Sequence, residues 1–254
     1  MPEMTSHPPG AFCWIELGTS DAAGARAFYT SLFQWTVTEH EMGPSGTYYI
    51  FQKNGKDVAA MYEISGEMKG MPTFWLSYIS VASADAAAEK AKSLGGKVMN
   101  GPFDAGENGR MAVLTDPQGA TFAIWQANSH AGVQARDDEN TLCWNELQAR
   151  DVSAARAFYP ALFNWRMKES PDYTEWHLGE HAVGGMIISQ SPPQVPSYWL
   201  PYFAVADCDA VTSKAQSAGG NVYVPPMDIP KVGRFSVVAD PQGAVFAVIK
   251  LDLA

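Results

Sequence analysis

Hydrophobic and polar residues follow one succession that occurs twice along the chain. Alternating large residues at 13–17 indicate a strand, and Asp21 then begins a helix whose Ala25, Phe28 and Leu32 share one face. Further strands are predicted at 48–52, 58–64, 74–81, 111–115 and 121–125, and a second helix at 84–94. The order strand, helix, three strands is therefore expected twice in the first half, and again in the second half, where Asp151 opens the matching helix.

Two blocks of the chain are near copies of each other. Residues 12–35 align without gaps on 142–165 with 13 of 24 positions identical, and residues 109–126 align on 233–250 with 10 of 18 identical. The offset changes from 130 to 124, so the loops between the blocks differ by only six residues. We therefore predict a duplication. Its parts are module 1 at 1–127, an exposed polar linker at 128–140 and module 2 at 141–254.

The composition indicates a globular protein with an acidic surface. Apolar residues make up 46% of the 254 residues, and 17 Lys and Arg stand against 27 Asp and Glu, a net charge of −10. This balance disfavours nonspecific binding to nucleic acid or to an anionic membrane, because both need clustered basic residues. Three widely spaced cysteines and the lack of a signal-like apolar stretch predict a cytoplasmic protein. Its expected state is a monomer or a homodimer, between which the sequence does not decide.

The repeated motifs resemble the vicinal oxygen chelate superfamily, which includes glyoxalase I, bleomycin-resistance proteins and extradiol dioxygenases. They are Trp-x-Glu-Leu, Ala-Arg-Ala-Phe-Tyr, Leu-Phe-x-Trp and Asp-Pro-Gln-Gly, and the resemblance covers about residues 12–126 and 142–250. The pattern is similar to that of tandem two-module glyoxalase-like proteins. It implies an α+β fold in which each module has two βαβββ units. Together the units form a cupped mixed sheet with helices outside and the ligand in the cup.

The resemblance also implies where a divalent metal would bind. The corresponding positions are Trp14, Leu76 and Ala123 in module 1 and Trp144, Leu200 and Ala247 in module 2. A metal ion needs oxygen, nitrogen or thiolate donors, which none of these side chains provides. We therefore expect no cofactor, and a divalent metal held by other residues is the alternative.

The first strand of each module carries the candidate catalytic residues, Glu16 and Glu146. Strand alternation places Phe12, Trp14 and Glu16 on one face and Cys13, Ile15 and Leu17 on the other. If the second set packs under the helix, the first set faces the cup, as do Trp144 and Glu146 in module 2. Burial beside indole rings is then expected to raise the pKa of both Glu carboxyls.

Each of these Glu residues has several candidate roles. It can act as a general base, as a partner for a cation or amide of a ligand, or as a fallback metal ligand. The structural alternative is a Glu that caps a loop or pairs with a nearby arginine such as Arg110. Tyr78 and Tyr202 share the predicted face and are candidate ligand-binding residues together with Trp14 and Trp144. The alternative for both tyrosines is an ordinary amphipathic wall.

Three functions are compatible with these residues. The first is a small-molecule-binding protein, in which some of the eight Trp residues stack on a flat ligand. The second is an enzyme, a metal-dependent or Glu-based lyase or isomerase, a dioxygenase or a hydroxylase. The third is a noncatalytic scaffold or interaction protein. The expected partner is a small molecule, and neither nucleic acid nor a membrane.

Overall fold

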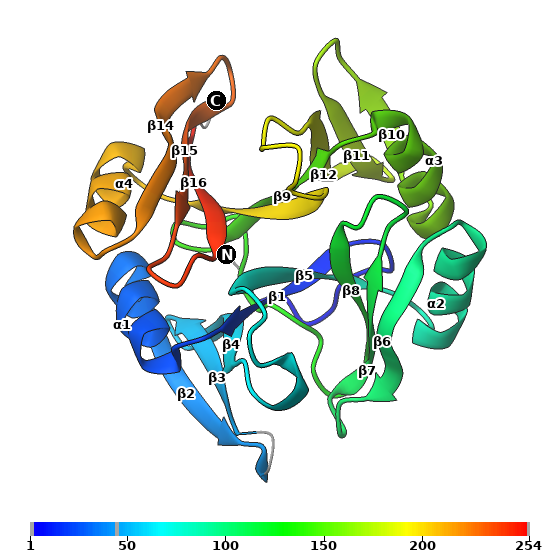
Figure 1. Ribbon diagram of the computed structural model, residues 1–254, viewed down its shortest axis with the longest axis horizontal. Coiled ribbons are helices and arrows are strands. Elements are labelled where there is room, and N and C mark those ends of the chain that lie inside the picture. Colours follow the sequence, from blue (N-terminus) through cyan, green and yellow to red (C-terminus); the bar gives the residue numbers. More distant parts are fainter. Residues whose placement is uncertain (1–2, 44–45, 253–254) are drawn as a thin grey trace.

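The computed structural model describes residues 3–43 and 46–252, which form two mixed eight-stranded sheets (Figure 1). Module 1 contains β1 Phe12–Thr19, α1 Ala22–Phe33, β2 Thr36–Glu41, β3 Thr47–Lys53, β4 Lys56–Glu63, β5 Phe74–Ser80, α2 Ala84–Ser93, β6 Lys97–Asp104, β7 Gly109–Thr115 and β8 Thr121–Ala127. Module 2 contains β9 Leu142–Ala149, α3 Val152–Phe163, β10 Arg166–Glu169, β11 Thr174–Leu178, β12 His181–Ile188, β13 Tyr198–Ala204, α4 Cys208–Ser217, β14 Asn221–Ile229, β15 Gly233–Ala239 and β16 Val245–Leu251. None of the helices described is long and apolar enough to cross a membrane.

The strand order confirms the predicted duplication and the α+β fold. The first sheet runs β2-β3-β4-β1-β5-β8-β7-β6, and the second repeats this order as β10-β11-β12-β9-β13-β16-β15-β14. The first strands of the two units, β1 and β5, pair antiparallel at the centre, while β1–β4 and β5–β8 are parallel. All eight residues of β1 are buried, as expected for a central strand that is covered on both faces. Figure 1 shows each sheet curved, with its helices on the outer side.

A side-chain cap at the first turn and a left-handed residue after the last turn account for both ends of helix α1. The Asp21 side chain accepts a hydrogen bond from the Gly24 N–H, which satisfies one of the free donors of the first turn. Gln34 adopts the left-handed conformation that ends the helix. Ala25, Phe28 and Leu32 are buried as predicted. Asp151 begins α3 in the same way and accepts from two N–H groups.

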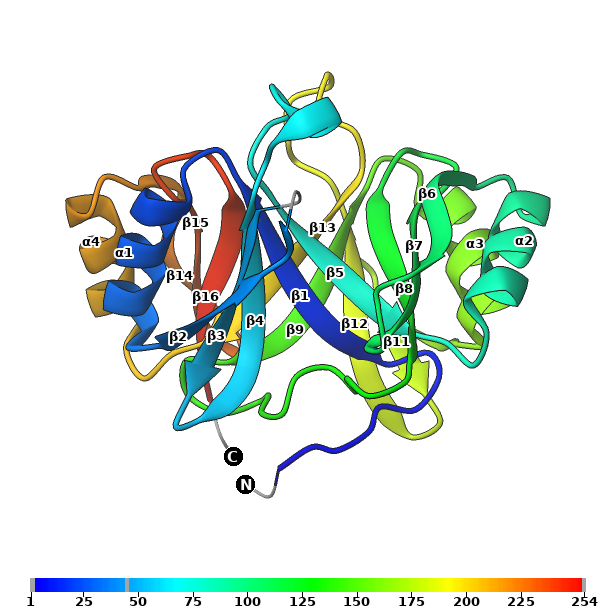
Figure 2. The same cartoon turned by 90° about the horizontal axis from the view of Figure 1, so that it is seen from below.

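Both hydrophobic cores are shared between the modules. α1 contacts α4 and α2 contacts α3, so each helix of module 1 lies beside one of module 2 (Figures 1 and 2). One core joins Ile15 and Phe28 of module 1 to Phe203 and Phe246 of module 2. The convex face of each sheet is therefore covered partly by its own helices and partly by the other module.

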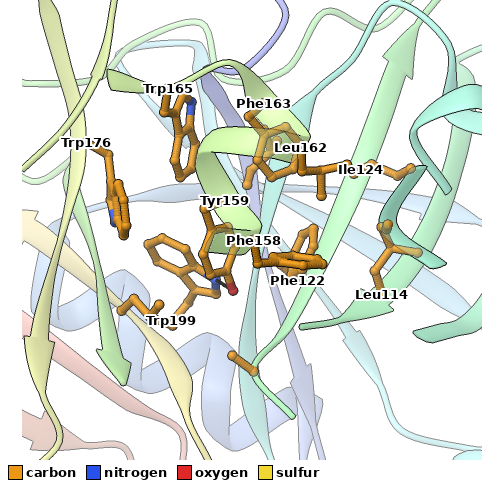
Figure 3. Close-up of a cluster of buried hydrophobic side chains, with 14 of the residues drawn as sticks. Leu114, Phe122, Ile124, Phe158, Tyr159, Leu162, Phe163, Trp165, Trp176 and Trp199 are labelled. Atoms are coloured by element: carbon orange, nitrogen blue, oxygen red, sulfur yellow. Dashed lines mark hydrogen bonds between the residues drawn. The ribbon is translucent and has the colours of Figure 1, made fainter. Parts of the chain in front are cut away.

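Figure 3 shows the second shared core, in which side chains of α3 lie against module 1. The rings of Phe158 and of Phe122 on β8 have centroids 6.3 Å apart at an interplanar angle of 70°. Tyr159 and Trp199 are nearly perpendicular, with centroids 5.2 Å apart. Edge-to-face contacts of this kind add to the stabilisation that comes from burying apolar area.

Buried hydrogen bonds also cross between the modules. Tyr29 Oη on α1 donates to Asp240 Oδ2 over 2.9 Å and accepts a hydrogen bond from Trp75 Nε1 over 3.1 Å. The second core repeats this arrangement, because Tyr159 Oη donates to Asp116 Oδ2 over 3.2 Å. Asp116 and Asp240 are the aspartates of the two Asp-Pro-Gln-Gly turns. The repeated Tyr and Asp therefore have a structural role at the contact between modules.

A bulge changes the predicted faces of the first two residues of β1. The pairing of β1 with β5 shifts register between Phe12 and Trp14. Phe12 consequently packs in the shared core, with its ring centroid 5.1 Å from that of Trp199. Cys13 clusters with Trp14 on the concave side. The predictions that Phe12 faces the cup and that Cys13 points to the helix side were therefore wrong, whereas Ile15 and Leu17 pack with α1 as expected.

The segment between the modules is less exposed than its polar sequence predicts. Val133 is fully buried within the module 1 cluster that contains Trp14, and its N–H donates to the Cys13 carbonyl over 2.8 Å. His130 is half-buried. The prediction of an exposed segment fails here because tertiary contacts bury residues that show no regular apolar spacing.

We expect the Tyr29→Phe substitution to lower the free energy of unfolding by about 1–3 kcal/mol, because buried Asp240 loses a hydrogen-bond donor. Urea titration followed by circular dichroism and tryptophan fluorescence measures this. Since the cores are shared, both signals should change in one transition. Tyr223→Phe is the matched control, because Tyr223 is 62% exposed. An effect of Tyr29→Phe no larger than that of the control would contradict a stabilising role for the cross-module bond.

Candidate ligand-binding sites on the two concave faces

In module 1 a carboxylate lies among aromatic side chains on the concave face. β1 brings Trp14 and Glu16 to this face, and the register pairs Trp14 with Tyr78 of β5. Tyr48 Oη of β3 donates to Glu16 Oε2 over 2.6 Å, and Tyr78 Oη donates to Glu16 Oε1 over 3.0 Å. Trp14 Nε1 donates to Tyr48 Oη over 3.1 Å. These four residues form the module 1 tetrad.

Module 2 has the same arrangement, the module 2 tetrad of Trp144, Glu146, Tyr173 and Tyr202. Tyr202 Oη donates to Glu146 Oε1 over 2.9 Å, and Trp144 Nε1 donates to Tyr173 Oη over 2.8 Å. The nearby Tyr173 phenol lowers the pKa of Glu146 and so opposes the effect of burial. A Cβ on Gly185 would lie 2.0 Å from Tyr173 Oη, so only glycine lets this phenol cross β12 towards Glu146.

The structure brings together all six predicted site residues, three in each module, but their chemical roles are still predictions. Tyr48 and Tyr173 are not among the residues predicted from the sequence, because they lie outside the two aligned blocks. Their separation of 125 residues, close to the offset of 124 in the following block, is the one signal that could have identified them.

Both Glu carboxyls are almost completely buried. Glu16 is 9% exposed and Glu146 is 8% exposed. Burial raises the pKa of each carboxyl, as expected from the sequence, and the hydrogen bonds from the tyrosine phenols oppose this rise. Arg110 forms its ion pairs with Asp85 and Asp104, so the alternative of an Arg110–Glu16 pair is wrong.

The positions at which the superfamily resemblance implies metal ligands lie in the apolar clusters of the concave faces. Leu76 and Ala123 cluster with Trp14, while Leu200 and Ala247 cluster with Trp144. Within residues 3–43 and 46–252, no group of three or more His, Cys, Asp or Glu side chains is placed to hold a metal ion. The donor set at these positions therefore does not fit a divalent metal.

The segment between the modules covers one end of the module 1 concave face. The His130 ring lies perpendicular to Trp14, with centroids 4.6 Å apart, and Trp125 Nε1 donates to the His130 carbonyl over 2.9 Å. Together with Val133, His130 buries Trp14. The matching residue of module 2, Trp144, is only half-buried. The two concave faces thus share a tetrad but differ in what surrounds it.

Comparison with known proteins identifies the family and the fold. The model of the Glyoxalase/Bleomycin resistance protein/Dioxygenase superfamily matches residues 12–124 and 141–248. The chain belongs to this superfamily. Among solved structures, it is similar to a Mn(II)-bound glyoxalase from Novosphingobium aromaticivorans, with TM-score 0.65 and 13% identity over 95% of this chain and 82% of the other. It is also similar to an extradiol ring-cleaving dioxygenase from B. fuscum, with TM-score 0.67 and 12% identity over 100% and 75%. These structures share its fold.

Two curated relatives match this chain over nearly its whole length. The putative glyoxylase CFP32 of Mycobacterium tuberculosis is 41% identical over 257 residues, which cover 98% of each chain. The anthracycline biosynthesis protein DnrV of Streptomyces peucetius is 36% identical over 264 residues, which cover 98% of this chain and 96% of the relative. Both matches therefore span the two modules.

The raised pKa of Glu16 predicts how stability depends on pH. Since the folded-state pKa lies above the unfolded value near 4.5, the contribution of Glu16 is fully present below pH 4.5 and is lost as the pH rises through the folded-state pKa. Relative to Glu16→Gln, the unchanged protein should lose about 1.4 kcal/mol for each pH unit between the two pKa values. Urea unfolding from pH 4 to 8 measures this difference. Glu63→Gln, at an exposed position on β4, is the control, and an equal pH dependence in both variants would contradict the prediction.

Proposed function

We propose that this superfamily member is a metal-independent small-molecule-binding protein whose ligand is flat and aromatic. The observation that carries the proposal is the tetrad, which occurs in both modules. A buried carboxylate is costly to desolvate, and Glu16 and Glu146, unlike Asp116 and Asp240, neither shape a turn nor join the two modules. Here Glu16 receives two phenol hydrogen bonds within an aromatic wall, which is the kind of polar group that orients a ligand in a mostly apolar pocket.

Two further observations support this proposal. The usual metal-ligand positions carry Trp, Leu and Ala in both modules, so the electrophilic metal that a glyoxalase-type isomerase or dioxygenase needs has no donors there. The name of the Streptomyces relative refers to anthracycline biosynthesis. Anthracyclines contain fused aromatic rings, which are a suitable shape for stacking on tryptophan.

The second candidate function is metal-free proton transfer by Glu16 or Glu146. The burial-raised pKa of both carboxyls favours it, because a general base works best with a pKa close to the working pH. A Glu16→Gln, Glu146→Gln double variant separates the two functions. It should abolish proton transfer but leave the stacking of a neutral aromatic ligand that has no N–H or O–H donor largely intact.

Binding of 1-aminoanthracene, a neutral tricyclic amine, tests the proposed function. We expect saturable binding, measured by the increase in its fluorescence. The Glu16→Gln, Glu146→Gln double variant should bind about tenfold more weakly, because a charge-assisted hydrogen bond is lost.

Glu63→Gln is the control, since Glu63 lies exposed at the end of β4. It should bind the dye as tightly as the unchanged protein. Absence of saturable binding to the unchanged protein, or equal affinity in the double variant and the control, would contradict a ligand site at the tetrads.

A further inference from the structure

A groove lies at the contact between helices α2 and α3, and none of the tetrad residues lines it. Its volume is about 430 Å³, within the range of roughly 300–1,000 Å³ that is usual for small-molecule sites. Figures 1 and 2 show α2 of module 1 beside α3 of module 2, so the groove needs both modules. We call it the α2–α3 groove, and its lining includes Pro9, Val81, Ala87, Lys90, Leu162 and Leu178.

The walls of this groove are mostly apolar, because the sequence puts small apolar residues at the start of α2. Five of the seven residues from 82 to 88 are alanine. Two of these alanines are buried beneath the helix, while Ala86 and Ala87 line the groove. Since α2 presents only methyl groups here, the space beside Leu162 and Leu178 stays open.

The matching place at the contact between α1 and α4 is built differently. Val211 of α4 stands where α2 has Ala87, 124 residues earlier. Lys53 ends β3 as Leu178 ends β11, and its ammonium donates to the Glu139 carbonyl. One half of the molecule thus has a larger side chain and a polar contact where the other half has alanine and leucine. The duplication alone therefore does not account for the apolar lining of the groove.

Lys90 brings a cation to this apolar groove. Its ammonium donates to the Leu162 carbonyl over 3.4 Å, which is long for a hydrogen bond. The matching residue of α4, Lys214, makes a shorter hydrogen bond to the Ser31 carbonyl. Within the described part of the chain Lys90 forms no ion pair, although Lys92 on the same helix forms one. The Lys90 side chain is exposed and is therefore available to an anion.

We propose that the α2–α3 groove binds a small amphipathic carboxylate, with its unbranched alkyl chain in the groove and its carboxylate on Lys90. The apolar walls account for the alkyl chain, because burying each methylene is favourable. A chain without branches fits between the methyl groups of α2 and the leucines opposite. The Lys90 ammonium accounts for the negative charge at one end. This site is separate from the tetrads, so the inference does not depend on the proposed function.

Isothermal titration calorimetry with sodium decanoate, kept below its micelle-forming concentration, tests the inference. We expect saturable binding of one molecule per chain. Lys90→Gln should weaken binding about threefold to fivefold, because an exposed ion pair with the carboxylate is lost. Lys92→Gln, on the same helix, is the matched control and should keep the affinity of the unchanged protein. Because Lys90 is exposed, its substitution leaves the fold intact.

Ala87→Val tests the groove itself, because it gives α2 the side chain that α4 has at the matching position. It should weaken decanoate binding about fivefold or more, since the added methyl groups take the place of part of the alkyl chain. Ala210→Val, at an exposed position near the start of α4, is the control and should leave binding unchanged. Thermal unfolding verifies that each variant is folded.

Three results would overturn the inference. The first is an absence of saturable decanoate binding to the unchanged protein. The second is an unchanged affinity in either Lys90→Gln or a folded Ala87→Val. The third is a loss of decanoate binding in the Glu16→Gln, Glu146→Gln double variant, which would place decanoate at the tetrads. Binding of 1-aminoanthracene is measured separately, so a failure of the proposed function is distinguishable from a failure of this inference.

Discussion

The hydrogen bonds from Tyr29 to Asp240 and from Tyr159 to Asp116 hold the two modules together within their shared cores. Each joins a helix of one module to a turn of the other, in a core where an unpaired carboxylate would be costly. The aspartates also accept backbone N–H groups within their own turns, so one side chain shapes the turn and fixes the neighbouring helix. This constraint makes the two sheets interdependent.

The convex faces of the two sheets form the shared cores between the modules, and the concave faces carry the tetrads. Trp14, Glu16 and Tyr78 of the module 1 tetrad lie on the central strands β1 and β5, which have neighbours on both sides, and Tyr48 joins them from β3. Glu16 is oriented by Tyr48 and Tyr78, which reach it from two different strands. The position of the carboxylate is thus determined by the curvature of the sheet and by rigid aromatic side chains, which suits a preorganised binding group.

Sequence patterns were enough to predict the duplication, the unit order and the meeting of Trp14, Glu16 and Tyr78, because all three follow from strand alternation and repeated motifs. They could not reveal the bulge after Phe12, since a local shift in register leaves no trace in the periodicity. Tyr48 was missed because only the pairing of β3 with β4, and of β4 with β1, brings its phenol within reach of Glu16. Val133 is buried by tertiary contact alone.

The segment between the modules has a consequence for how such proteins diversify. Its residues His130 and Val133 contribute to the wall around Trp14, but they belong to neither sheet. Substitution of His130, which is half-buried, would alter the wall around Trp14 from outside the two shared cores. The connection between two duplicated modules is thus a part of the chain where the shape of one concave face can change without a change in any strand or helix.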